Sequence, residues 1–121
     1  TANPLGTFLS TGIYYTDTTT PLAANATFTG SSRTMAAGNN KFNAYTASDQ
    51  ISTTDGFRIE SSVDNTNWKP LEKATSSVIY GTAHCIAKLT ANRESTYFRV
   101  FQLNSPYAQS TLRITSSQTP V

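Results

Sequence analysis

Hydrophobic and polar residues alternate along several short stretches of this chain, most clearly between residues 57 and 63. One face of an extended strand would carry Phe57, Ile59, Ser61 and Val63, and the opposite face would carry Arg58, Glu60 and Ser62. A period of two residues is typical of a half-buried antiparallel strand. The Asp and Asn residues within 64–67 favour a turn because their side chains bond to nearby backbone, and Trp68 then opens a return strand. This segment therefore predicts a β-hairpin.

Short strands with turn residues between them are expected through the rest of the chain. They cover residues 25–28, 33–36, 42–47, 78–80, 83–89, 96–103 and 109–115. The inward positions predicted on them are Phe42, Ala44, Thr46, Leu112 and Ile114. Residues 49–55 form a polar loop that ends at Gly56, and a short strand is also expected near residues 12–15. Pro70 marks a bulge or an edge strand, because proline cannot donate to a sheet.

No segment has the periodicity of an amphipathic helix, no internal repeat recurs, and no linker divides the chain. Strands separated by turn signals at this density are typical of a sandwich or a barrel rather than of βαβ units. We therefore expect an all-β protein with a single antiparallel β-sandwich, jelly-roll-like or immunoglobulin-like, over residues 22–121. An extended N-terminal arm would precede it.

The predicted arm covers residues 1–21, which are rich in Thr, Gly and Pro and have few apolar anchors. Chain ends are often poorly ordered, so a frayed terminus is one interpretation. The other is an arm that pairs with a neighbouring subunit. The aromatic residues Phe8, Tyr14 and Tyr15 favour this second interpretation, because a loose tail gains nothing from such side chains.

Composition narrows the classes of function. Thr, Ser and Asn make up 44 of the 121 residues, whereas only 13% are charged and the net charge is +2. The nine Lys and Arg residues are scattered, which argues against a nucleic-acid partner. No apolar run approaches the roughly 20 residues of a membrane span, and the first residues lack a secretory signal. We therefore expect synthesis in the cytosol and no membrane partner.

Residues with catalytic or metal-binding chemistry are sparse. The single cysteine, Cys85, excludes an internal disulfide, and its neighbour His84 would point to the opposite face of a strand. A zinc site needs three or four ligands, more than one His and one Cys supply. Asp49, Asp55 and Asp64 could hold calcium only if their loops met at one end of the sandwich. We expect no enzymatic activity, no cofactor and no metal.

The candidate contact residues are aromatic or basic. Trp68 either packs at a corner of the core or offers a stacking platform to a glycan, with tyrosines such as Tyr45 and Tyr107 beside it. Arg58, Arg99 and Arg113 fall on outward strand faces. They are either solvated or form a row of contacts to a partner protein or to a second copy of the module.

Several segments, taken together, resemble a known group of proteins. In order, they are residues 22–29 (LAANATFT), 47–50 (ASDQ), 57–68 (FRIESSVDNTNW), 97–100 (YFRV) and 108–114 (AQSTLRI). Over residues 22–117 their order and spacing are similar to small β-sandwich modules of tailed-bacteriophage virion proteins. The resemblance implies a structural or attachment role on a virion, without choosing between capsid, tail and baseplate.

Together with the short length of the chain and its N-terminal arm, the resemblance favours a phage capsid decoration (cement) protein on the capsid surface, made in the host cytoplasm. It would bind the major capsid protein and copies of itself, as a trimer, and stabilise the head by surface burial and strand addition. The alternative is a carbohydrate-binding receptor-attachment module of the tail or baseplate. A secreted adhesin domain is a third hypothesis and would require an upstream signal peptide.

Overall fold

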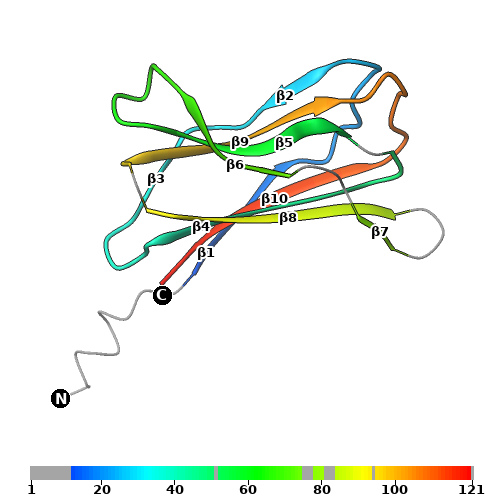
Figure 1. Ribbon diagram of the computed structural model, residues 1–121. Helices are drawn as coiled ribbons and strands as arrows, with labels where there is room; N and C mark the ends of the chain where they lie inside the picture. The colour runs from blue at the N-terminus through cyan, green and yellow to red at the C-terminus, as the bar shows by residue number, and fades with distance from the viewer. Residues whose placement is uncertain (1–11, 51, 75–77, 81–83, 94, 121) are drawn as a thin grey trace.

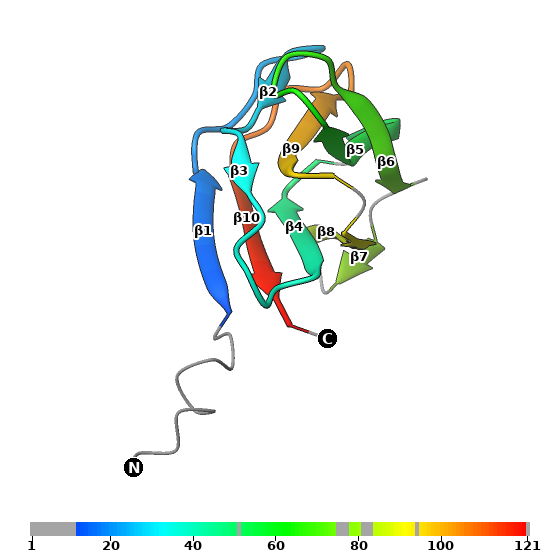
Figure 2. The same cartoon turned by 90° about the vertical axis from the view of Figure 1, so that its left-hand side faces the viewer.

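The computed structural model describes residues 12–50, 52–74, 78–80, 84–93 and 95–120, and in them it shows two antiparallel sheets that lie face to face (Figures 1 and 2). Sheet A contains, in spatial order, β1 (Ile13–Thr18), β10 (Leu112–Thr119), β4 (Lys41–Ser48), β8 (His84–Asn92) and β7 (Val78–Tyr80). Sheet B contains β2 (Thr27–Thr29), β9 (Tyr97–Asn104), β5 (Ser52–Ser62) and β6 (Lys69–Ala74), and β3 (Arg33–Thr34) pairs with β9. The predicted all-β sandwich is confirmed.

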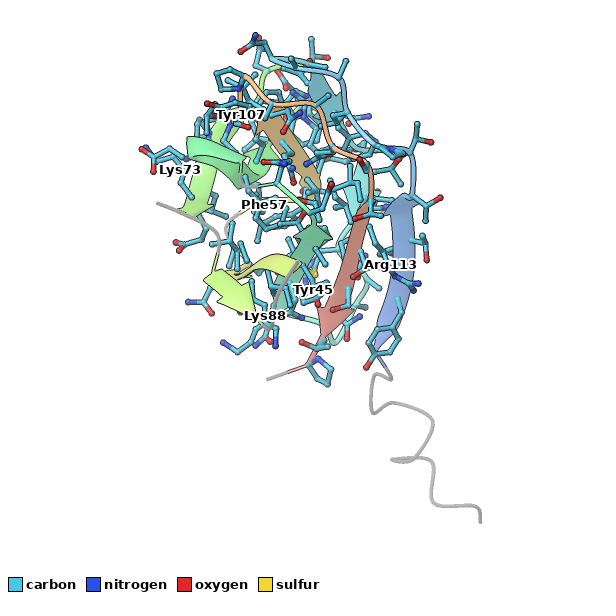
Figure 3. The ribbon with its side chains drawn as sticks, turned by 90° about the vertical axis from the view of Figure 1, so that its right-hand side faces the viewer. Tyr45, Phe57, Lys73, Lys88, Tyr107 and Arg113 are labelled. Carbon is cyan, nitrogen blue, oxygen red and sulfur yellow. The ribbon has the colours of Figure 1, made fainter. Side chains whose placement is uncertain are left out.

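Alternation of side chains builds the core between the sheets. In β4, β9 and β10, every second residue is buried. The buried hydrophobic residues are Met35, Phe42, Ala44, Phe57, Ile59, Ala87, Ala91, Phe98, Val100, Leu112 and Ile114. Phe42 of sheet A stacks on Phe98 of sheet B with ring centroids 5.4 Å apart, and Phe57 also lies between the sheets (Figure 3). All inward positions predicted on the strands of residues 42–47 and 109–115 are buried.

A buried glutamine, Gln118 in β10, connects three parts of the fold. Its Nε2 donates to the hydroxyl of Tyr15 and to the carbonyl of Thr34, both at 2.8 Å. Its Oε1 accepts from the backbone N–H of Ala36 at 2.8 Å and from Asn39 Nδ2 at 3.3 Å. A buried amide is stable only when its hydrogen bonds are made, so Gln118 fixes β1 and the loop after β3 relative to β10.

Asn104 plays a similar part at the other end of the sandwich. Its Nδ2 lies 2.9–3.1 Å from the carbonyls of Leu22, Ala23 and Tyr107, and its Oδ1 accepts from the N–H of Ser105. Between the sheets, the Thr46 hydroxyl donates to Gln102 Oε1 at 2.8 Å. Buried amides therefore hold the connecting loops that the hydrophobic core does not cover.

The predicted hairpin forms, with one correction. Phe57, Ile59 and Ser61 are buried as expected, but Val63 is 77% exposed. β5 ends at Ser62, so the strand alternation no longer applies at Val63. The Ser62 hydroxyl accepts from the N–H of Asn65 at 2.9 Å, and Asn65 adopts a left-handed φ of 61° that asparagine tolerates.

Asp64 closes this turn with its carboxylate. Its Oδ1 accepts from the N–H groups of Thr66 at 2.9 Å and Asn67 at 2.8 Å, and its Oδ2 accepts from Asn67 Nδ2 at 2.7 Å. These bonds favour the ionised form of the carboxylate and so hold the pKa of Asp64 well below its usual range. The bond from the N–H of Asn67 has the largest effect.

Two other loop predictions can be compared with the structure. β5 starts at Ser52, so the prediction of a polar loop over residues 49–55 was wrong in its second half. The register of β5 on β9 shifts between Ser52 and Phe57, where Asp55 has a φ of 58°. The interpretation of Pro70 is confirmed: β6 is an edge strand of sheet B, and its register on β5 shifts beside Pro70.

The predicted N-terminal arm divides into two parts. Residues 1–11, and with them Phe8, lie outside the described residues. Ile13–Thr18 forms β1, which pairs with β10 of the same chain and so belongs to the sandwich. An ion pair of 3.0 Å between Asp17 and Arg33 connects β1 to β3. Residues 13–18 are therefore an edge strand rather than a free arm.

We expect Gln118→Met to destabilise the fold by about 2–4 kcal/mol, since it removes the hydrogen bonds of several buried groups without opening a large cavity. Urea denaturation would show a lower midpoint with an unchanged slope. Ser117→Ala, on the solvent side of the same strand, is the control and should cost less than about 1 kcal/mol. Equal midpoints for the two variants would contradict the role assigned to Gln118.

The depressed pKa of Asp64 makes its contribution to stability dependent on pH. That contribution is present above the pKa of the unfolded chain and is lost as the pH falls toward the pKa of the folded state. Asp64→Asn should therefore lower the Tm at neutral pH, and its difference from the wild type should shrink between about pH 5 and about pH 2. Thermal scans across this range check the prediction, and a difference that stays constant would refute it.

Candidate binding surfaces

The candidate contact residues lie on opposite outer faces of the sandwich. Arg58, Arg99 and Trp68 belong to strands β5 and β9 and to the residue before β6, in sheet B. Tyr14 and Arg113 belong to β1 and β10, in sheet A. A single row of arginine contacts, one of the two interpretations from the sequence, is therefore wrong. Each face has its own chemistry.

On sheet B, five side chains form a continuous stack that we call the arginine stack: Trp68, Arg99, Glu60, Arg58 and Phe101. The Arg99 guanidinium lies 4.2 Å from the centroid of the Trp68 ring, and the Arg58 guanidinium lies 4.0 Å from that of Phe101. Both Nε atoms donate to Glu60, at 2.8 Å from Arg99 and 2.9 Å from Arg58. Aromatic rings and one carboxylate thus hold both cations.

The charged groups of the arginine stack are paired with one another. Glu60 points away from the core, yet it is only 5% exposed, because the two arginines lie beside its carboxylate. A carboxylate this buried requires paired charges. Trp68 is half-buried, with Arg99 stacked on its ring. The tryptophan therefore packs on the outer face of sheet B, rather than in the core.

Tyr15 does not join Tyr14 in an aromatic cluster. Neighbouring residues of a strand point to opposite faces. The Tyr15 hydroxyl accepts from Gln118 Nε2 at 2.8 Å, and the Arg33 guanidinium lies 3.9 Å from the centroid of its ring. Tyr14 points outward instead and is 75% exposed. Tyr15 is therefore held within its own sandwich, whereas contact of these tyrosines with a partner stays a prediction.

The outer face of sheet A has an open groove with a volume of about 570 Å³. Residues that pair across neighbouring strands line it in two rows. The first row is Tyr14, Ser117, Asn43 and Thr90, and the second is Thr16, Thr115, Tyr45 and Lys88. Arg113 borders the second row on β10. Figure 3 shows Tyr45, Lys88 and Arg113 on this side of the molecule.

Asn43 orders the middle of the groove. Its Nδ2 donates to the hydroxyls of Ser117 and Thr119, both at 3.1 Å, and its Oδ1 accepts from the Thr90 hydroxyl at 3.0 Å. These bonds use the donors of the amide. The Ser117 hydroxyl accepts from Asn43, so its own proton can be donated to a ligand. The Thr90 hydroxyl donates to Asn43, so its lone pairs can accept a hydrogen bond from a ligand.

The groove is positively charged. Its lining includes Lys88 and Arg113 and no carboxylate among the described residues. Neither Lys88 nor Arg113 forms a salt bridge with any residue that the structure describes. Lys88 Nζ lies 5.7 Å from the centroid of the Tyr45 ring, within the range of a cation–π contact. Sequence reasoning had identified Tyr14 and Arg113, but not Asn43 or Lys88, whose positions depend on strand pairing.

Two of the aspartates considered for calcium, Asp49 and Asp64, accept hydrogen bonds from backbone N–H groups of loops. Asp49 accepts from the N–H groups of Thr111 at 3.0 Å and Ser110 at 2.9 Å. The bond from Thr111 is the main reason why the pKa of Asp49 is lowered. No three His, Cys, Asp or Glu side chains gather into a metal site in the described ranges. His84 and Cys85 belong to β8, but their side chains lie outside the described part.

The described residues contain no helix with the length and hydropathy needed to cross a bilayer. A search of the curated proteins found no match. Among solved structures, the crystal structure of the PBSX exported protein XepA matches with a TM-score of 0.70 at 17% sequence identity. The match covers 90% of this chain and 37% of XepA, so the chain spans less than two fifths of that protein. The likeness shows a shared fold.

A family model identifies the chain more directly than this structural likeness. The model is described as the N-terminal domain of the uncharacterised protein YqxG, and residues 5–119 match it. The match includes every strand of both sheets. The chain therefore belongs to the YqxG N-terminal domain family.

Proposed function

We propose that the chain is a component of a phage particle that acts by binding and not by catalysis. Two observations support this. Its segments resemble virion sandwich modules of tailed phages, and its fold is shared with XepA, an exported protein of phage PBSX. Among the side chains that the structure describes, neither outer face brings together a nucleophile and a base, because the arginine stack is internally paired and the groove offers hydroxyls, tyrosines and cations.

Within a phage particle, the groove on sheet A favours an attachment module that binds a carbohydrate on the host surface. The observation that carries this proposal is the pair of outward tyrosines, Tyr14 and Tyr45, which line the groove together with hydroxyl and amide groups. Aromatic rings pack on the apolar faces of sugars, and polar groups of fixed orientation select their hydroxyls. The module would sit on the tail or baseplate.

Capsid decoration is the second candidate, and the edge strand β1 favours it. β1 ends sheet A, and its residues Ile13 and Tyr14 are 38% and 75% exposed. An exposed edge with apolar side chains can accept a strand from another chain. In this case the partners would be the major capsid protein and further copies of the chain, as a trimer on the capsid surface.

Antibodies raised against the chain and imaged on purified particles would separate the two candidates. We expect label on the tail or baseplate if the chain is an attachment module, and label over the head if it is a decoration protein. Particles without label would refute a virion role in both forms.

Particles assembled with Tyr14→Ala and Tyr45→Ala together should adsorb to host cells at least about tenfold more slowly, because aromatic anchors dominate binding surfaces. Adsorption is measured as free phage remaining over time. Tyr107→Ala is the matched control, since Tyr107 is 68% exposed but lies outside the groove. Unchanged adsorption of the double variant would contradict attachment through the groove.

A further inference from the structure

We propose that the groove on sheet A binds an anionic glycan, that is, a sugar polymer with carboxylate or phosphate groups. This inference deepens the attachment function and rests on it. It names the ligand class that the residues of the groove would recognise. Three features of the groove carry it: the spacing of its tyrosines, the order of its hydroxyl groups and the state of its cations.

The tyrosines are spaced for a chain rather than for a single small molecule. Tyr14 lies on β1 and Tyr45 on β4, with β10 between them. Two strand spacings amount to about 10 Å, which exceeds the width of one sugar ring. A ligand that contacts both rings therefore runs across the strands, over Ser117 and Thr115 of β10.

The hydroxyls along this path have a fixed arrangement. Asn43 holds Ser117, Thr119 and Thr90 through its amide. Groups oriented before binding lose little conformational freedom when a ligand arrives. Asn43 is thus a positioning residue: its own donors are used, and it presents the hydroxyls of its neighbours to the ligand.

The cations of the two sheets differ in a way that points to a negatively charged ligand. On sheet B, Arg58 and Arg99 are both bonded to Glu60. On sheet A, Lys88 and Arg113 are exposed and have no carboxylate partner among the described residues. An arginine can bind a carboxylate or a phosphate through two parallel hydrogen bonds, so these two cations can pair with acidic groups along a glycan.

Three forms of one polymer test this ligand class. The full chain is titrated with neutral dextran, carboxymethyl dextran and dextran phosphate, and binding is measured by isothermal titration calorimetry at low and at high salt. We expect both anionic polymers to bind at least about tenfold more tightly than neutral dextran, with affinity falling as salt screens the charges. A difference in affinity between carboxymethyl dextran and dextran phosphate would show whether the groove prefers carboxylate or phosphate groups.

Variants separate the groove from general positive charge. Lys88→Gln with Arg113→Gln, and separately Tyr45→Ala, should each weaken binding at least about tenfold. The matched control is Lys69→Gln with Lys73→Gln, which removes the same charge from exposed positions of β6 on the other sheet. Figure 3 shows Lys73 there. The control should change affinity less than about twofold. Thermal unfolding verifies that every variant is folded.

Several results would overturn the proposal. They are equal binding of neutral and anionic dextran, no binding of either anionic polymer, and an equal loss in the control variant. Single-stranded DNA is titrated in the same way, and tighter binding of the DNA than of both anionic dextrans would also overturn the proposal. The particle-labelling experiment, which tests the virion role, does not depend on any of these results. Slower adsorption of the tyrosine variant, together with no anionic binding, would leave attachment standing and remove only the ligand class.

Discussion

The strict alternation of side chains along β4, β9 and β10 is the constraint on which this structure depends. Each strand places every second residue in the core, where Phe42 and Phe98 join the sheets. The residues between them must then face solvent. The same pleat that buries Phe42 and Ala44 therefore places Asn43 and Tyr45 in the groove. Core and binding surface are two sides of one pattern, so a one-residue slip would exchange them.

Buried amides extend this order beyond the strands. The core is small, and the loops at both ends depend on Gln118 and Asn104, whose hydrogen bonds replace contacts that larger apolar residues would make. Such bonds are directional, so they fix positions more tightly than apolar contact does. Gln118 donates a hydrogen bond to the hydroxyl of Tyr15, which lies within β1. Its neighbour Tyr14 is thereby kept at the border of the groove.

Local pattern predicted the sandwich, the hairpin and most inward residues, since alternation is visible within a few residues of sequence. It was wrong at Val63, where the strand had already ended, and it did not show that Tyr15 faces inward while Tyr14 faces outward. The pairing of β1 with β10 joins residues about one hundred positions apart, and no local signal encodes it. The groove could not be predicted for the same reason: Asn43, Lys88 and Ser117 become neighbours only through the register of three strands.

The contrast between the sheets also bears on how strongly the groove can bind. The arginine stack offsets the cost of burying Glu60 with two cations, which leaves little for a ligand. The two cations of the groove have no carboxylate partner in the described part of the chain, but the groove is open to solvent, where water and salt weaken each contact. One groove should therefore bind a glycan weakly. A repeated polymer met by several copies of the chain gains avidity without any new contact. A shallow site of this kind suits a particle that attaches through many copies.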